Sequence, residues 1–176
     1  ASRFLLKHET ADASLYAALH PGYTLAQRVD ALQRLRRAGY EIGSGFIVGV
    51  PGQRPETLAD DILLARELHV DMCGAGPFIP QHDTPLGAYP AGSAQLALRV
   101  MAVMRIVMPW ANIPATTALA TVDAQGGQRN GLLAGGNVLM PSFTPSAYGS
   151  QYCIYDNKNR VDMLGARKAI EGAGRS

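Results

Sequence analysis

Apolar residues recur along this chain at two spacings, which predict strands and helices in alternation. The stretch Tyr40–Gly52, YEIGSGFIVGVPG, is predicted to be a buried strand over Ile42–Val50 that ends in a Val-Pro-Gly turn. Three glycines, Gly43, Gly45 and Gly49, interrupt this strand. Glycine weakens a strand, so the pattern indicates either a face left bare for a ligand or tight packing against a neighbouring helix. The spacing leaves both interpretations open.

The clearest helix begins at Thr24, where Thr24-Leu-Ala-Gln27 fits a capping box. Leu25, Val29, Leu32 and Leu35 give it one apolar face, and Gly39 ends it. Further helices are predicted over Glu56–Leu68, Ala94–Met108, Gln128–Ala134 and Asn159–Gly172. Pro55 suits the first helical position of one of them, and Ser93 can cap another. Further strands are predicted over Arg3–His8, Val70–Phe78, Ile113–Leu119 and Val138–Met140.

Strands separated by helices at this spacing predict an α/β fold with right-handed crossovers and a parallel sheet. The predicted units are too few for a closed eight-stranded barrel, which takes about 250 residues. An open doubly wound sheet and the second part of an incomplete barrel both fit. The chain starts on a strand with no leading helix to cover its edge, which favours the incomplete barrel. We expect residues 1–155 to form this partial TIM-type barrel and residues 156–176 to form a C-terminal helix and tail.

The composition is that of a globular domain, with 47% hydrophobic and 17% charged residues among 176. A net charge of +2 gives no indication of nucleic acid or a membrane surface as a partner. We find neither an apolar run of about 20 residues nor an export signal. Cys73 and Cys153 lie in no metal-binding spacing, and we interpret them as reduced thiols of a cytoplasmic protein.

Candidate chemistry gathers where the predicted strands end, because ligands of parallel α/β folds bind at the carboxyl ends of the strands. Lys7, His8 and Glu9 lie at the end of the first strand and suit a ligand's carboxylate and amine, with Glu9 facing the cation. Surface salt bridges are the alternative. Arg28 lies in a first helical turn, where the helix dipole disfavours a cation, which indicates an anionic ligand. A pair with Asp30 is the alternative there.

Thr116 and Thr117 lie in a predicted strand, which would send their hydroxyls to opposite faces, one of them into a barrel. Plain β-propensity also accounts for them. The sequence shows no hydrolase constellation and no zinc pattern, and we assign no histidine to a metal.

Several segments are similar to the C-terminal part of HydE, the radical S-adenosylmethionine maturase of iron–iron hydrogenase. They are LLKHET (5–10), GSGFIVGVPGQ (43–53), GPFIPQHDTPL (76–86), MRIVMPWANIPATTA (104–118) and NVLMPSFTPSAYGSQYCIY (137–155). GFIVGVPG is typical of the wider biotin-synthase-like group, whereas PFIP…DTPL and NIPATTA indicate HydE specifically.

The resemblance implies a (βα)8 barrel in which a 4Fe–4S cluster reductively splits S-adenosylmethionine to a 5′-deoxyadenosyl radical. In HydE-like proteins this chemistry serves assembly of the diiron subcluster from an organometallic iron substrate. The resemblance further implies cofactor contacts for Glu9, Arg28 (as carboxylate partner), Ile47, Ile79, Met140, Tyr152 and Ile154. It implies substrate or anion contacts for Lys7, Thr116 and Thr117. Lys7 stands where an arginine is usual, so bidentate anion binding is lost there.

The chain departs from the family in having no CxxxCxxC cluster loop, and its two cysteines do not replace three thiolates. We therefore expect it to supply about strands 4–8 of the barrel, to be inactive alone, and to need an N-terminal half-barrel. Another biotin-synthase-like enzyme, such as biotin synthase or methylornithine synthase, is one alternative. A non-catalytic half-barrel that self-associates is the other.

Overall fold

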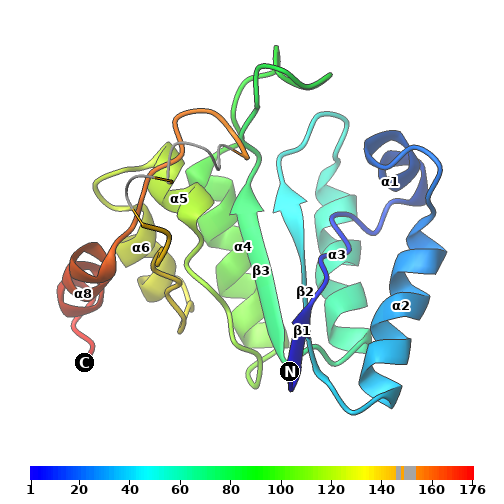
Figure 1. Cartoon of the computed structure of the whole chain (residues 1–176), viewed down its shortest axis with the longest axis horizontal. Coiled ribbons are helices and arrows are strands. Elements are labelled where there is room, and N and C mark those ends of the chain that lie inside the picture. Colours follow the sequence, from blue (N-terminus) through cyan, green and yellow to red (C-terminus); the bar gives the residue numbers. More distant parts are fainter. Residues whose placement is uncertain (146–147, 149–153) are drawn as a thin grey trace.

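A computed structural model of the protein describes residues 1–145, 148 and 154–176. Its strands are β1 (Arg3–Leu5), β2 (Glu41–Val48) and β3 (Met72–Pro77), paired in parallel in the order β1-β2-β3. The loops that follow β2 and β3 lie together at the edge of the sheet where both arrows end (Figure 1). The helices are α1 (Ala13–Leu19), α2 (Leu25–Arg37), α3 (Pro55–Glu67), α4 (Ala94–Val107), α5 (Thr117–Val122), α6 (Gly127–Leu133) and α8 (Met163–Gly172).

Three predicted helix starts, at Thr24, Pro55 and Ser93, are confirmed, whereas the helix predicted from Asn159 begins only at Met163, after its cap Asp162. Thr24 Oγ1 accepts the Gln27 N–H at 3.2 Å and Gln27 Oε1 accepts the Thr24 N–H at 2.9 Å, which closes the capping box. Pro55 is the first residue of α3, and Ser93 caps α4 by accepting the Leu96 N–H. Within the described part of the chain, the helices are too short or too polar to cross a membrane.

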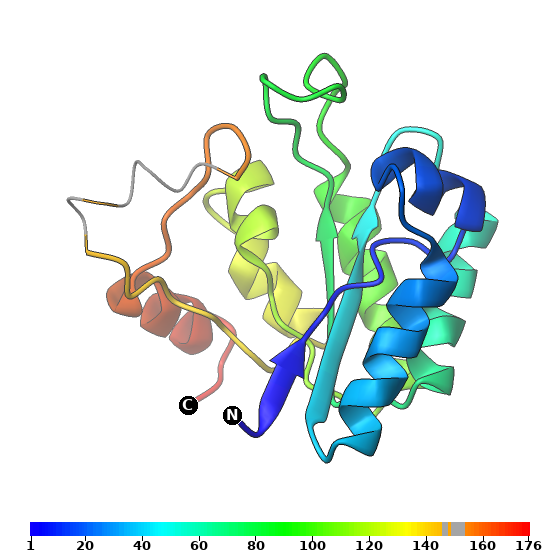
Figure 2. The same cartoon turned by 45° about the vertical axis from the view of Figure 1, so that its right-hand side comes forward.

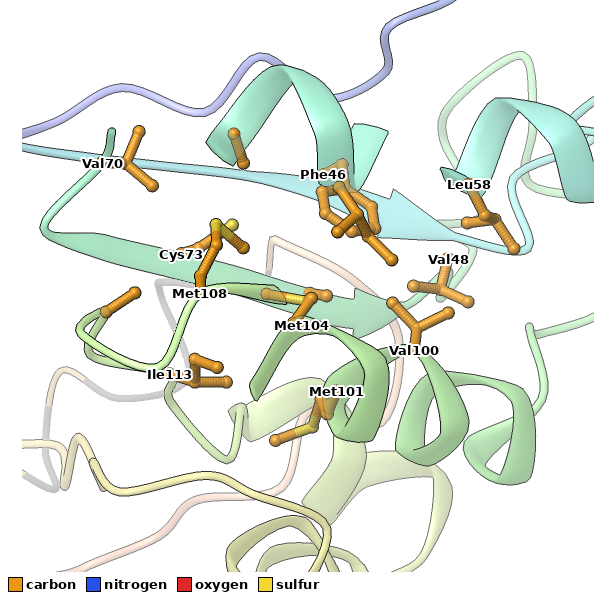
Figure 3. Packing of buried hydrophobic residues seen from close by; sticks show 14 of the residues in the cluster. Phe46, Val48, Leu58, Val70, Cys73, Val100, Met101, Met104, Met108 and Ile113 are labelled. Atoms are coloured by element: carbon orange, nitrogen blue, oxygen red, sulfur yellow. The ribbon is translucent and has the colours of Figure 1, made fainter. Parts of the chain in front are cut away.

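One face of the sheet packs against helices and carries the core. α2 and α3 contact β2, and α4 contacts β3 (Figure 2). Figure 3 shows Phe46 and Val48 from β2 and Cys73 from β3 facing Met104 of α4, all of them buried. Close packing of these side chains is the main hydrophobic contribution to the stability of the fold.

The other face of the sheet is built largely of glycine. A Cβ at Gly45 would lie 2.1 Å from the carbonyl oxygen of Gly74, its partner on β3. A Cβ at Gly76 would lie 2.9 Å from the hydroxyl of Thr116. Helices cover the opposite face, so the glycine face is the one left for close approach of other segments.

Two predicted strands are wrong. Residues 112–114 form only isolated bridges with Met72 and Val138, and a helix begins at Thr117 inside the predicted strand Ile113–Leu119. Pro114 has no N–H to give a ladder, and Thr116 Oγ1 accepts the Leu119 N–H as a helix cap. The predicted strand Val138–Met140 is likewise reduced to the bridge at Val138.

Gly45→Ala is expected to lower the free energy of unfolding by about 3 kcal/mol, because the new methyl group meets backbone on β3. Gly43→Ala is the matched control on the same strand, since its Cβ meets the end of the exposed Leu5 side chain at 2.6 Å. That side chain can move, so the control should lose less than about 1 kcal/mol. Urea unfolding measures both, and equal losses would contradict the backbone contact.

Candidate functional site

A cavity of about 550 Å³ opens on the glycine side of the sheet, beside the carboxyl ends of β2 and β3. Gly74, Gly76 and Pro77 of β3 form part of its wall. The size and the mainly apolar wall with few polar groups are typical of a small-molecule site. The cavity brings together most of the site residues predicted from sequence: Lys7, Glu9, Ile47, Ile79, Thr116, Thr117, Met140 and Ile154.

The charged groups of the cavity are Lys7 and Glu9. Lys7 Nζ lies 3.5 Å from Glu9 Oε2, and the two side chains are 35% and 22% exposed. A partly exposed pair of this kind contributes little to stability, so its members remain able to exchange partners with a ligand. Lys7 suits an anion and Glu9 suits an amine or another cation.

Glu9 has an unusual backbone conformation with a positive φ of 66°. The Thr10 N–H donates to the His8 carbonyl at 2.8 Å, so a hydrogen bond spans Glu9 alone, the pattern of a rare and strained γ-turn. Glu9 also pairs with β2, since its N–H donates to Gly45 and its carbonyl accepts from Ile47. The short predicted strand Arg3–His8 therefore breaks after Leu5 and resumes at Glu9.

Thr116 and Thr117 reach the cavity from a helix start. The prediction that a strand turns their hydroxyls to opposite faces is wrong, because Thr116 is the N-cap and Thr117 the first residue of α5. Both still line the cavity. Gly76 allows this approach, because any side chain there would collide with Thr116.

Arg28 lies apart from the cavity wall, in the first turns of α2. Its Nε donates to the Tyr16 hydroxyl at 2.9 Å, and its guanidinium carbon lies 5.8 Å from the Tyr16 ring centre. Asp30, the alternative partner, pairs with Arg34 and Arg37 instead. α2 begins toward the edge where the strands end, the same edge as the cavity (Figure 2).

Two loops contribute Ile79 and Ile154 to the cavity wall. His82 Nδ1 lies 2.8 Å from Asp156 Oδ1, and the Asp156 N–H donates to Pro80 at 3.1 Å, so the loops are joined. The hydrogen bond with Asp156 raises the pKa of His82. Tyr152, the remaining predicted cofactor contact, lies outside the described residues.

His8 was also a candidate for ligand contact, but it is fully buried and turned away from the ligand side. Its Nδ1 lies 2.9 Å from Ser44 Oγ, and its Nε2 lies 3.7 Å from Oδ1 of the fully buried Asp61. Burial raises the pKa of Asp61, against the nearby His8 imidazole and the hydrogen bond from the Ala11 N–H, which lower it. Sequence reasoning missed Asp61, which looks like one more polar residue of an amphipathic helix.

The described residues do not fit an iron–sulfur cluster. Among residues 1–145, 148 and 154–176, no three His, Cys, Asp or Glu side chains are placed to hold a metal ion. Cys73 is buried and its pKa is raised to about 12, so it stays a thiol and not the thiolate that iron requires.

Comparisons with known proteins agree with the fold. No family model matches the chain. The crystal structure of methylornithine synthase (PylB) superimposes on all of this chain and on 52% of its own, with a TM-score of 0.82 and 24% identity. The fold is therefore that of a partial (βα)8 barrel, as the sequence predicts.

Several enzymes are also similar to the chain in sequence. It is 45% identical to the [FeFe] hydrogenase maturase subunit HydE of Thermotoga maritima over 90% of this chain and 45% of HydE. It is 28% identical to 3-methylornithine synthase of Methanosarcina acetivorans over 99% of this chain and 49% of that enzyme. It is 36% identical to biotin synthase 2 of Frankia casuarinae over 56% of this chain.

These homologues are radical S-adenosylmethionine enzymes, and the sequence similarity relates this chain to that class. Within that class the resemblance to HydE is confirmed along nine tenths of the chain. The chain spans about half the length of two of these curated relatives, HydE and 3-methylornithine synthase.

Glu9→Gly is expected to be more stable than Glu9→Ala by about 1 kcal/mol, because glycine alone accepts a positive φ without strain. Both variants remove the carboxylate, so their difference isolates the backbone. Lys7 has no positive φ and is the control, where alanine should be the more stable replacement. Urea unfolding tests the order, and a Glu9→Ala variant as stable as Glu9→Gly would contradict it.

Proposed function

We propose that this chain forms the C-terminal half of a HydE-like barrel and that its cavity binds S-adenosylmethionine. The observation that carries the proposal is the convergence of residues from separate elements, Glu9, Ile47, Ile79 and Met140 among them, on one cavity. The HydE resemblance predicts all four as cofactor contacts, and a fold of another kind would scatter them.

Each kind of side chain in the site suits a different portion of the cofactor. Glu9 takes the amine of the methionine portion, while the apolar side chains Ile47, Ile79, Met140 and Ile154 surround the less polar parts. Arg28 takes the carboxylate. Its bond to Tyr16 uses Nε, which leaves the terminal nitrogens as the donors for such a group. Tyr152 remains a proposed contact.

Lys7, Thr116 and Thr117 are proposed to hold the substrate or an anion deeper in the cavity. Two hydroxyls and one ammonium suit an anionic or polar ligand, but they cannot form the bidentate pair of hydrogen bonds that an arginine would. By the resemblance to HydE, the substrate is a small molecule or an organometallic iron species, and the overall task is assembly of the diiron subcluster of [FeFe] hydrogenase.

The 4Fe–4S cluster supplies the electron that splits S-adenosylmethionine in this class of enzyme. This chain has two cysteines and no CxxxCxxC loop. We therefore propose that the cluster ligands come from an N-terminal half-barrel outside these 176 residues, and that the chain alone does not cleave the cofactor. Domain limits of 1–155 for the barrel portion and 156–176 for the tail belong to the same proposal, as does a cytoplasmic location.

The outer edge of β1 is where we propose that this half-barrel joins. Phe4 and Leu5 are 45% and 51% exposed there, and β1 pairs only with β2 among the described strands. Exposed strand edges with apolar side chains favour pairing with another strand. A second copy of this chain is the competing occupant, which corresponds to the non-catalytic, self-associating module.

Calorimetry with S-adenosylmethionine on the 176-residue chain tests the proposal. Glu9→Gln and Arg28→Ala should each weaken binding about tenfold, because each removes one charge-assisted contact. Glu67→Gln, an exposed acid at the end of α3, is the control and should bind as the unchanged chain does. Lack of binding by the unchanged chain, or equal affinities in all variants, would refute the proposed cofactor site.

A further inference from the structure

Beside the cavity, whose lining includes Ser44, lies a buried cluster of polar side chains that the proposed function does not use. His8, Ser44 and Asp61 are each 0% exposed, and they join the turn after β1, the strand β2 and the helix α3. Buried polar groups cost free energy unless they are paired, so a cluster this deep in the fold calls for an explanation.

The hydrogen bonds of Ser44 define how His8 is held. Ser44 Oγ accepts the His8 backbone N–H at 3.2 Å, lies 2.9 Å from His8 Nδ1, and lies 3.1 Å from the Leu6 carbonyl. One hydroxyl proton serves either the carbonyl or the imidazole. If the proton goes to the imidazole, Nδ1 is the acceptor and the ring's own proton lies on Nε2; if it goes to the Leu6 carbonyl, a neutral imidazole has its proton on Nδ1 instead. The Asp61 carboxylate, 3.7 Å from the otherwise unpaired Nε2, favours the first arrangement, because only then does Nε2 present a proton to it.

Asp61 contacts both sides of Glu9. Its Oδ1 faces His8, the residue before Glu9, and accepts the backbone N–H of Ala11, two residues after it. Glu9 lies between these contacts with φ 66° and points the other way, into the cavity. A strained conformation persists only where the surroundings hold it on both sides.

The second oxygen of Asp61 reaches another part of the cavity wall. Gln53 Nε2 donates to Asp61 Oδ2 at 3.3 Å and to the Ile47 carbonyl at 2.8 Å. Gln53 Oε1 accepts the Gly49 N–H at 2.6 Å. A single carboxylate therefore links the turn that carries Glu9 to the end of β2 that carries Ile47.

We propose that Asp61 is a positioning residue for the ligand site, which fixes Glu9 and Ile47 from behind through His8, Ala11 and Gln53. The inference rests on the proposed function only in taking S-adenosylmethionine as the ligand. The geometry of the Glu9 turn depends on Asp61 whatever the ligand is.

Asp61→Ala and Ile62→Ala form the matched pair of variants, since both truncate a buried side chain of α3 at neighbouring positions. Asp61→Ala should weaken S-adenosylmethionine binding about tenfold, as loss of a supporting residue does. Ile62→Ala removes only core packing, so its affinity for S-adenosylmethionine should stay within about twofold of that of the unchanged chain. Asp61→Asn keeps an acceptor for the Ala11 N–H, so its affinity should be closer to that of the unchanged chain than the affinity of Asp61→Ala is.

Nuclear magnetic resonance gives a readout that needs no ligand. The three-bond coupling and the Cα shift of Glu9 report its φ, and both should move toward values for ordinary negative φ in Asp61→Ala but not in Ile62→Ala. If Asp61→Ala does not fold, His8→Asn replaces it, because it keeps a donor for Ser44 and removes the atom that faces Asp61.

Unchanged Glu9 couplings in Asp61→Ala or its substitute, or equal losses of affinity in the matched pair, would overturn the positioning role. If the unchanged chain binds no S-adenosylmethionine while the Glu9 couplings respond to Asp61, the proposed function fails and Asp61 still positions the turn. The two proposals are thereby tested separately.

Discussion

The close backbone contact between β2 and β3 is the constraint on which the rest of the structure depends. Gly45 and Gly74 lie opposite each other, and a single methyl group at Gly45 would run into the Gly74 carbonyl. The same strands carry Phe46, Val48 and Cys73 toward the helices. Because side chains alternate between the two faces of a strand, the large side chains lie on one face and the other face is left open for a cavity.

In the turn after β1, two successive residues likewise face opposite sides, one the buried interior and the other the cavity. His8 is buried among Ser44 and Asp61, whereas Glu9 faces the cavity in a strained conformation. The stability of the buried cluster and the position of the ligand group are therefore linked. The contacts of this buried cluster hold Glu9 in its strained conformation, and they join residues that lie far apart in the sequence.

Periodicity and capping residues predicted most of the fold, because they act within a few residues of chain. The capping box at Thr24 and the helix start at Pro55 are examples. The strand predicted over Ile113–Leu119 failed because its apolar alternation continued into residues that Thr116 caps as a helix. A helix as short as α1, capped by Asp12, offered too little periodicity to be predicted.

The candidate site was predicted from the HydE resemblance more than from local pattern. Separate motifs placed Glu9, Ile79 and Thr116 in one site, and the structure brings them to one cavity. Asp61 and Gln53 were not predicted, since a buried acid in a helix looks like an exposed one until its surroundings are known. Arg28 was singled out by its place in the helix, and the structure adds Tyr16 as the group that holds it.

The central claim is that a ligand occupies the glycine face of the sheet, and amide chemical shifts during titration with S-adenosylmethionine test it most directly. The account predicts the largest changes at Glu9, Gly76 and Ile79, with none at Leu63 and Val103 on the outer face of α3 and α4. Shifts concentrated on that outer face, or no shifts at cofactor concentrations well above those of the protein, would contradict it.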